Sequence, residues 1–197
     1  AAQAMNAYVV VFHPGYYGKL TPESAVKAVI EGLEAVVAKA EELGIKGPQL
    51  GPETTGRRAQ VGTLEEVIEI CKRVKSTRPV IDWAHLYARG RGGYITEPKH
   101  VIEVIEAIEK ELGSNALKPL HCHFSKIAYG SGGEREHKQL KEEGYGPDFR
   151  MICRTLLEIG VTEAVFISES PVLELDALVM KRIYEEELSR IAGKAQG

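Results

Sequence analysis

Five short apolar runs in the sequence each end in a side chain that could bind a metal ion. The residues at or just after these ends are His13, Glu53, Asp82, His85, His121 and Glu169. Imidazole nitrogens together with carboxylate oxygens suit Zn²⁺ and Mn²⁺, because these ions accept mixed nitrogen and oxygen ligands. A single histidine of this kind is more often an ordinary structural residue. Five such strand ends in one chain instead indicate a polynuclear metal site.

A helix-like stretch follows each apolar run, and this alternation predicts how the ligands are positioned. Thr21 and Pro22 start a helix that ends at Gly44, and Thr63 to Glu66 form a capping box at the start of a second one. Further helices are expected after Glu97-Pro98, from about Asp148 to Gly160, and from about Leu173 to Ile191. Alternating strands and helices predict a parallel sheet in which the carboxyl ends of all strands share one edge. An open doubly wound sheet and a barrel both satisfy this pattern.

Composition indicates one globular domain over residues 1–197. No long linker or charge block divides the 197 residues, and no run of eighteen apolar residues predicts a signal or membrane segment. The three cysteines, Cys71, Cys122 and Cys153, are odd in number and far apart, so a disulfide framework is not expected and a cytoplasmic location is. A net charge of -3 argues against a broad basic coat, although a local basic patch could still attract nucleic acid.

Taken together, the strand-end motifs resemble the endonuclease IV family of AP endonucleases, which have a xylose-isomerase-like TIM barrel. The resemblance extends from about residue 1 to about residue 185. The matching motifs are Val11-Phe12-His13-Pro14-Gly15, Gly51-Pro52-Glu53-Thr54-Thr55-Gly56, Asp82-Trp83-Ala84-His85, His121-Cys122-His123-Phe124-Ser125-Lys126 and Glu169-Ser170-Pro171. This resemblance implies an α/β fold that is a partial TIM (β/α)8 barrel of about five parallel strand–helix units. The chain looks like a C-terminal fragment that lacks the first three units.

The resemblance also implies an activity, namely metal-dependent hydrolysis of the phosphodiester at abasic sites in DNA, impaired by the missing units. Up to three zinc ions would be bound, and Mn²⁺ would also fit. Glu53 would be the catalytic residue, bridging two ions and orienting the attacking water. The implied ligands are His13 and Glu53 for an incomplete first site, Glu53, Asp82, His121 and Glu169 for the second, and His85, Glu134 and His137 for the third. Glu136 is an alternative to Glu134.

Other features of the rim bear on this expectation. Thr54 and the pair His123-Phe124 stand where the family has asparagine and Asn-Asp, so the surroundings of the ions would differ. Gly130 to Gly133 is expected to form a flexible loop before the third-site ligands. Basic residues in three rim loops could contact DNA phosphates, although surface loops are often basic without such a role. They are Arg57, Arg58, Arg89, Arg91, Lys126 and Arg135.

Two alternatives remain open. Sugar isomerases and epimerases of the same superfamily use a Glu, Asp, His, Glu set, which Glu53, Asp82, His121 and Glu169 match equally well. The extra ligands at His13, His85 and the 134–137 loop favour the endonuclease. The other alternative is a non-catalytic barrel fragment. Five units leave two sheet edges unpaired, so a homo-oligomer or another partner is expected to cover them.

Overall fold

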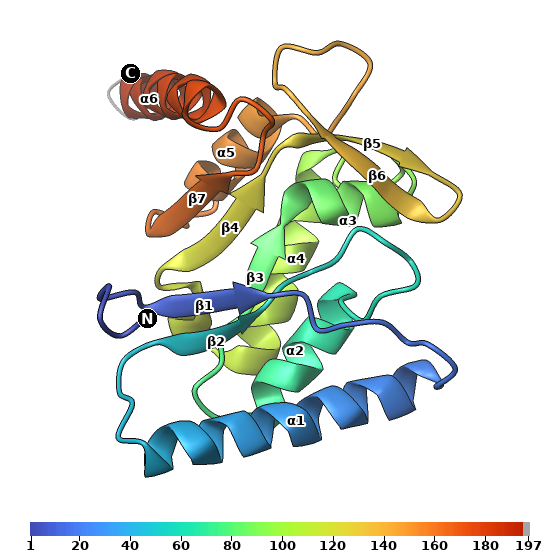
Figure 1. Ribbon diagram of the computed structural model, residues 1–197. Coiled ribbons are helices and arrows are strands. Elements are labelled where there is room, and N and C mark those ends of the chain that lie inside the picture. The colour runs from blue at the N-terminus through green and yellow to red at the C-terminus, as the bar shows by residue number, and fades with distance from the viewer. Residues whose placement is uncertain (195–197) are drawn as a thin grey trace.

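Strands and helices alternate along the chain in the computed structural model, which describes residues 1–194 (Figure 1). The elements are β1 (Val9–Phe12), α1 (Pro22–Glu42), β2 (Gln49–Pro52), α2 (Leu64–Arg73), β3 (Val80–Asp82), α3 (Trp83–Arg89), α4 (Pro98–Leu112), the 3₁₀ turn η1 (Ser114–Leu117), β4 (Leu120–Phe124), β5 (Lys126–Gly130), β6 (Gly133–Lys138), α5 (Phe149–Glu158), β7 (Ala164–Ser168) and α6 (Glu174–Lys194). Each of the five expected strands and five expected helices is present.

Local capping explains where the helices begin. Thr21 caps α1, which begins at Pro22. Its side chain accepts a hydrogen bond from the backbone N–H of Ser24. Thr63 and Glu66 form the full capping box of α2. Each cap satisfies backbone N–H groups that have no partner inside the helix. The helix starts therefore follow from neighbouring residues, as the sequence predicts.

The strands β1, β2, β3, β4 and β7 lie in chain order and run in one direction. β1 pairs with β2 in parallel, and β4 pairs in parallel with both β3 and β7. Single parallel bridges, Leu50 with Thr77 and Glu53 with Val80, connect β2 to β3. A doubly wound sheet would reverse its strand order at a switch point, so this order identifies a partial barrel. Among residues 1–194, the outer edges of β1 and β7 have no strand partner.

Two apolar clusters hold the helices against the strands. The larger one lies between the β3–β4–β7 sheet and its helices and includes Ile81, Trp83, Leu120 and Phe124. The smaller one, with Val26, Ile30, Leu33, Val61 and Ile70, packs α1 and α2 together. All three cysteines are free thiols, as expected. No helix among the described residues is both long and apolar enough to cross a membrane.

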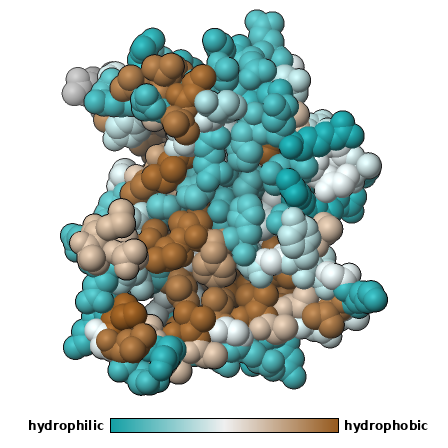
Figure 2. Space-filling model, viewed as in Figure 1, coloured by the Kyte–Doolittle hydropathy of each residue, from teal (hydrophilic) through white to brown (hydrophobic). Residues whose placement is uncertain are grey.

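Apolar side chains also remain exposed near the open edges of the sheet. Figure 2 shows hydrophobic residues over β7 and over the region of β1, β2 and α1. Val10 on β1 is 39% exposed and Ile167 on β7 is 44% exposed. These strands would have their faces covered in a closed barrel, which explains their apolar character.

The segment after β4 contains two strands that were not expected, one on each side of the predicted glycine loop. Residues 126–138 form an antiparallel hairpin of β5 and β6, and Gly130 to Gly133 make its turn. A register shift between Ala128 and Tyr129 interrupts the pairing, and the polar sequence of β6 hides the strand pattern. The helix α3 was also not expected; Asp82 caps it by accepting a hydrogen bond from the His85 backbone N–H at 2.6 Å. Both elements carry candidate metal ligands.

The hairpin turn is fastened to the loop that follows β2. The Glu134 N–H donates to the Gly56 carbonyl at 3.0 Å, and the Arg58 N–H donates to the Gly132 carbonyl at 2.9 Å. Gly133 has a φ of 92°, and a Cβ atom there would overlap the Gly56 carbonyl oxygen. The glycine is therefore required for the approach of the two segments.

Gly133→Ala is expected to lower the free energy of unfolding by about 2–3 kcal/mol, because it adds left-handed backbone strain to a steric clash. Urea denaturation would measure the change. Gly132→Ala is a matched control, since a Cβ at Gly132 meets no atom within 4 Å. Equal effects of the two substitutions would show that the contact with Gly56 is not what requires Gly133.

Candidate metal centre

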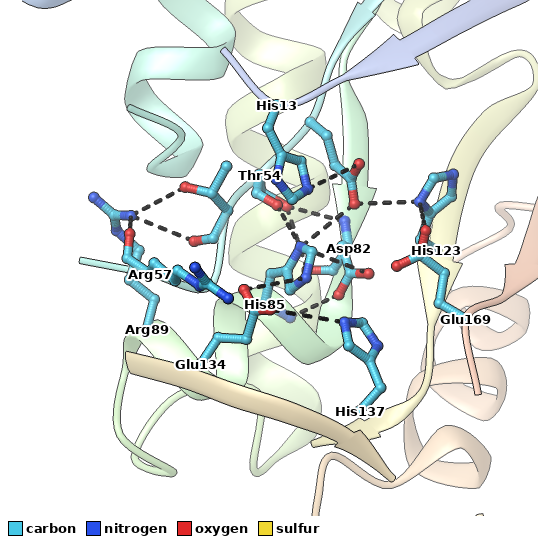
Figure 3. Close-up of polar contacts among 12 residues, drawn as sticks. His13, Thr54, Arg57, Asp82, His85, Arg89, His123, Glu134, His137 and Glu169 are labelled. Carbon is cyan, nitrogen blue, oxygen red and sulfur yellow. Dashed lines mark hydrogen bonds and ion pairs between the residues drawn. The ribbon is translucent and has the colours of Figure 1, made fainter. Parts of the chain in front are cut away.

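The carboxyl ends of the parallel strands, the helix α3 and the hairpin β5–β6 bring eight candidate ligand side chains together. Figure 3 shows His13, Asp82, His85, His123, Glu134, His137 and Glu169 pointing toward one another. Their ligand atoms form three groups within which all distances are below 4.8 Å, namely His13, Glu53 and His85, then His85, Glu134 and His137, then Glu53, Asp82, His123 and Glu169. Shared residues connect the groups, so the arrangement suits several ions side by side.

Distances in the two groups that contain His85 fit ligands of a common ion. His13 Nε2 lies 3.5 Å from Glu53 Oε2, and His85 Nε2 lies 3.6 Å from Glu134 Oε2. His137 Nε2 lies 3.9 Å from Glu134 Oε1. Two ligands of a tetrahedral zinc ion are about 3.4 Å apart, given bonds of about 2.1 Å. Direct hydrogen bonds would be shorter, at about 2.7–3.2 Å.

Two buried atoms in the centre have no hydrogen-bond partner, namely Asp82 Oδ2 and His85 Nε2. An unpaired buried polar atom costs about 1–3 kcal/mol, so native proteins rarely retain one without a compensating ligand. Both atoms belong to the candidate groups. The residues present therefore fit metal ions.

Hydrogen bonds from outside the groups orient two of the histidines. His85 Nδ1 donates to the Thr54 carbonyl oxygen at 2.9 Å, which leaves the lone pair on Nε2. Because Nε2 faces Glu134, His85 belongs with Glu134 and His137 rather than with His13. Ser125 Oγ lies 2.8 Å from His137 Nδ1 and orients that ring in the same way. Ser125 belongs to one of the matching motifs, but the motif by itself did not indicate this contact.

Glu53 occupies the middle of the centre and is only 3% exposed. Its Oε1 lies 3.2 Å from His123 Nδ1, while its Oε2 faces His13. The two oxygens thus belong to different groups, as a bridging carboxylate requires. Once His85 is assigned elsewhere, the described chain supplies only His13 and Glu53 to the first group.

The structure brings His123, and not His121, into the four-residue group. His123 Nδ1 lies 3.0 Å from Glu169 Oε1, whereas His121 Nδ1 forms a short hydrogen bond with the Tyr8 hydroxyl. The two histidines are two residues apart on β4 and therefore share a face, with Cys122 turned into the core. Asp82 pairs with His123, so His121 lies about 7 Å deeper in the barrel.

Substitution of each histidine by alanine is expected to separate the two roles. His123→Ala should lose about one zinc equivalent, since it removes one of four ligands from a group. His121→Ala should retain the full zinc content because His121 lies outside every group. Elemental analysis after dialysis against a weak chelator would measure the content. Zinc loss only in His121→Ala would instead support His121 as the ligand, as the motif implies.

Charges in the centre favour protonated histidines as long as no ion is bound. Burial acts to lower the pKa of His123, but Glu169 and Glu53 raise it to about 10. The pKa of His85 also rises to about 10, because Asp82 and Glu53 outweigh burial. Burial acts to raise the pKa of Glu53, but the neighbouring rings of His123, His13 and His85 hold it well below its usual range. Metal ions would therefore have to displace protons.

The remaining predicted residues differ in their availability. Arg57, Arg58, Arg91 and Arg135 are exposed. Arg89 instead donates to the Arg57 carbonyl at 2.8 Å and to the Tyr17 hydroxyl at 2.9 Å. Lys126 Nζ donates to the Glu142 carbonyl at 2.6 Å. Arg89 and Lys126 therefore stabilise loops, whereas the four exposed arginines could reach a ligand.

Glu136 lies outside the three groups. It forms a 2.7 Å ion pair with Lys138, and its side chain is 66% exposed. Of the two carboxylates that the sequence left open, the structure thus brings Glu134 into the centre.

Comparison with known proteins agrees with this architecture. The chain is 36% identical over 177 residues to an uncharacterized protein of Methanocaldococcus jannaschii, covering 90% of this chain and 63% of that protein. It is 28% identical over 196 residues to a probable endonuclease 4 of Aster yellows witches'-broom phytoplasma, covering 97% of this chain and 62% of the relative. The chain thus spans less than two thirds of the length of these curated relatives.

A solved structure and a family model lead to the same fold. The crystal structure of a D-tagatose 3-epimerase-like protein superimposes with a TM-score of 0.65 at 25% identity, covering 98% of this chain and 67% of that one. The model of the xylose isomerase-like TIM barrel family matches residues 1–192. With nearly its whole length matched, this chain belongs to the xylose isomerase-like TIM barrel family.

Proposed function

We propose that the metal centre hydrolyses the DNA phosphodiester at abasic sites. The observation that carries this proposal is the group of His85, Glu134 and His137, which lies beside the four-residue group and adds a further ion position. A sugar isomerase with one ion would not need it. Neighbouring ions are typical of phosphodiester hydrolysis, in which both the attacking and the leaving oxygen must be stabilised. The relatives named probable endonuclease 4 also support the proposal.

Each part of the centre has a role in this reaction. His13 and Glu53, the four-residue group, and the group around His85 would hold zinc ions. When bound, such ions neutralise phosphate oxygens and lower the pKa of the attacking water. Glu53 would hold that water between the groups by accepting a hydrogen bond from it. A carboxylate with a lowered pKa stays ionised, which suits this orienting role.

DNA would approach over the exposed arginines of the same rim. Arg57 and Arg58 lie in the loop after β2, and Arg135 lies on the hairpin that carries Glu134. Arginines placed in this way contact phosphates without reading the base sequence. The partner in this proposal is duplex DNA that contains an abasic site.

Incision of a duplex with one abasic site would test the proposal. His123→Ala and Glu169→Ala should abolish incision by the zinc-loaded protein. Incision that survives both substitutions would indicate a contaminant, and absence of incision by a zinc-loaded protein would contradict the proposal for this chain.

Arg57→Glu is expected to weaken binding of the same duplex about five- to tenfold in low salt, because it replaces a phosphate contact by a like charge. Fluorescence anisotropy would measure the dissociation constant. Arg73→Glu on α2 is the matched control, since Arg73 is exposed but lies away from the rim. A similar loss in both variants would mean that only net charge matters.

A sugar isomerase or epimerase is the second candidate, favoured by the likeness to the D-tagatose 3-epimerase-like structure. Glu53, Asp82, His123 and Glu169 could by themselves hold one Mn²⁺. Metal titration separates the two candidates. Binding of about one equivalent of Mn²⁺ without zinc retention, together with ketose epimerisation, would replace the endonuclease proposal.

The open edges of the sheet suggest a partner as well. We propose that a second copy of the chain, or another polypeptide, covers the exposed residues around Val10 on β1 and Ile167 on β7. A catalytically inactive fragment would need such a partner equally. A stable monomer at micromolar concentration in sedimentation velocity would contradict this part of the proposal.

A further inference from the structure

A second polar pocket lies at the end of the strands opposite to the metal centre. The cavity has a volume of about 300 Å³, and its lining includes Gln49, Arg78, Asn115 and Lys118. Gln49 begins β2, while Arg78 and Lys118 lie two residues before the first residues of β3 and β4. In Figure 1 the arrowheads of β3 and β4 point away from these positions, toward the hairpin β5–β6. The pocket is therefore separate from the metal centre.

Arg78 is a buried cation whose positive charge is not balanced. Arg78 is only 7% exposed, and no carboxylate among residues 1–194 forms an ion pair with it. One Nη2 N–H donates to the Pro119 carbonyl at 2.9 Å, and the guanidinium carbon lies 5.2 Å from the ring centroid of Tyr8. The buried Nε has no hydrogen-bond partner.

This arrangement is costly unless an anion compensates it. A guanidinium carries five N–H donors and does not lose its charge, so it cannot relieve burial by deprotonation. Isolated buried charges are strongly unfavourable, and proteins nearly always pair them. The ring of Tyr8 and one carbonyl oxygen satisfy only part of this requirement.

The rest of the pocket also favours an anion. Its lining includes no aspartate or glutamate. Lys118 adds a second cation at the mouth, where its side chain is exposed, and no ion pair of Lys118 occurs within the described part of the chain. The amide groups of Asn115 and Gln49 offer further N–H donors. Two cations with several neutral donors form a setting for a small oxyanion.

We propose that this pocket binds a phosphate group, either as inorganic phosphate or as part of a small phosphorylated metabolite. The tetrahedral oxygens would accept from Arg78 and Lys118, which would neutralise the buried guanidinium. A volume of about 300 Å³ lies at the lower end of small-molecule sites, which excludes large ligands. Phosphate binding in this pocket does not depend on the proposed reaction.

Calorimetric titration of the purified protein with inorganic phosphate would test the site. Lys118→Glu should weaken phosphate binding at least tenfold, because it places a carboxylate at the mouth. Its exposed position makes unfolding of this variant unexpected. Lys110→Glu is the matched control, since Lys110 is an exposed lysine on the neighbouring α4 and does not line the pocket. This control should bind within about twofold of the wild type.

Two further arms separate the sources of binding. Phosphate bound only at the metal centre would be lost in Glu53→Gln and unchanged in Lys118→Glu, whereas binding in this pocket should show the reverse. Tighter binding of methyl phosphate than of inorganic phosphate would identify a phosphorylated metabolite as the natural ligand, and the opposite order would identify free phosphate. Equal losses in Lys118→Glu and Lys110→Glu, or no binding at millimolar phosphate, would overturn the proposal.

Discussion

Glu53→Gln is expected to remove bound zinc from two of the three groups and to lower the rate of the proposed phosphodiester hydrolysis at least about a thousandfold. The substitution keeps the shape of the side chain but removes the negative charge that faces His13 on one side and His123 on the other. A neutral amide cannot bridge two cations with equal strength. Elemental analysis and the incision assay would measure the two effects.

Glu136→Gln provides the matched control for this substitution. Glu136 lies on the hairpin close to the centre, but its exposed carboxylate pairs with Lys138 and belongs to no ligand group. Zinc content and rate should therefore stay within about twofold of the wild type, as for most surface substitutions. A full zinc complement in Glu53→Gln would show that Glu53 does not bridge the groups.

Zinc is expected to reverse the pH dependence of stability. In the metal-free protein the pKa values of His85 and His123 are raised from 6.5 to about 10, so protonation stabilises the folded state. That contribution is fully present below about pH 6.5 and is lost as the pH rises toward 10. In the zinc-loaded protein the same rings must be neutral, so stability is lost as the pH falls below about 6.5.

The affinity for zinc should depend on pH because zinc displaces the same protons. Because each of the two groups releases about one proton on binding, the apparent dissociation constant should rise about tenfold for each pH unit lost between 10 and 6.5. Chelator competition at several pH values would measure this dependence, and thermal unfolding with and without zinc would measure the stability. If the stability changed with pH in the same way with and without zinc, the assignment of His85 and His123 as ligands would be contradicted.

The strand ends show how much of the centre could be predicted from local pattern. Val9 to Phe12 and Val80 to Asp82 are apolar runs that stop at a polar residue, and parallel strands place such stops at one edge. This rule located His13, Glu53, Asp82 and Glu169. Helix starts at Thr21 and Thr63 were predictable because capping involves residues only three positions apart.

Local pattern could not decide which histidine of β4 belongs to the centre. His121 and His123 have the same alternation, and only the pairing of Asp82 with His123 shows which one lies at the rim. Strand register is a property of two segments about forty residues apart, and period-two alternation is unchanged by a shift of two residues. The choice of His121 came from motif spacing, which lacks this information.

The hairpin and the loop arginines illustrate the same limit. Glu134 reaches His85 because the β5–β6 turn packs on Gly56, and this contact depends on a distant backbone approach at Gly133. Arg89 resembles Arg57 in sequence, but five internal acceptor atoms, one of them the Gln60 carbonyl oxygen, occupy its guanidinium. Burial and partners of a long polar side chain follow from packing rather than from its neighbours in the chain.

The amino-acid sequence thus contained the ligand types, the order of the strands and helices, and the shared edge, because these depend on short-range patterns of polarity and capping. The tertiary structure decided which atoms meet. It placed His123 beside Glu169, left Asp82 Oδ2 unpaired within the centre, and buried Arg78 without a carboxylate. Strand register, hairpin packing and the loss of water from a side chain arise only when distant segments come together.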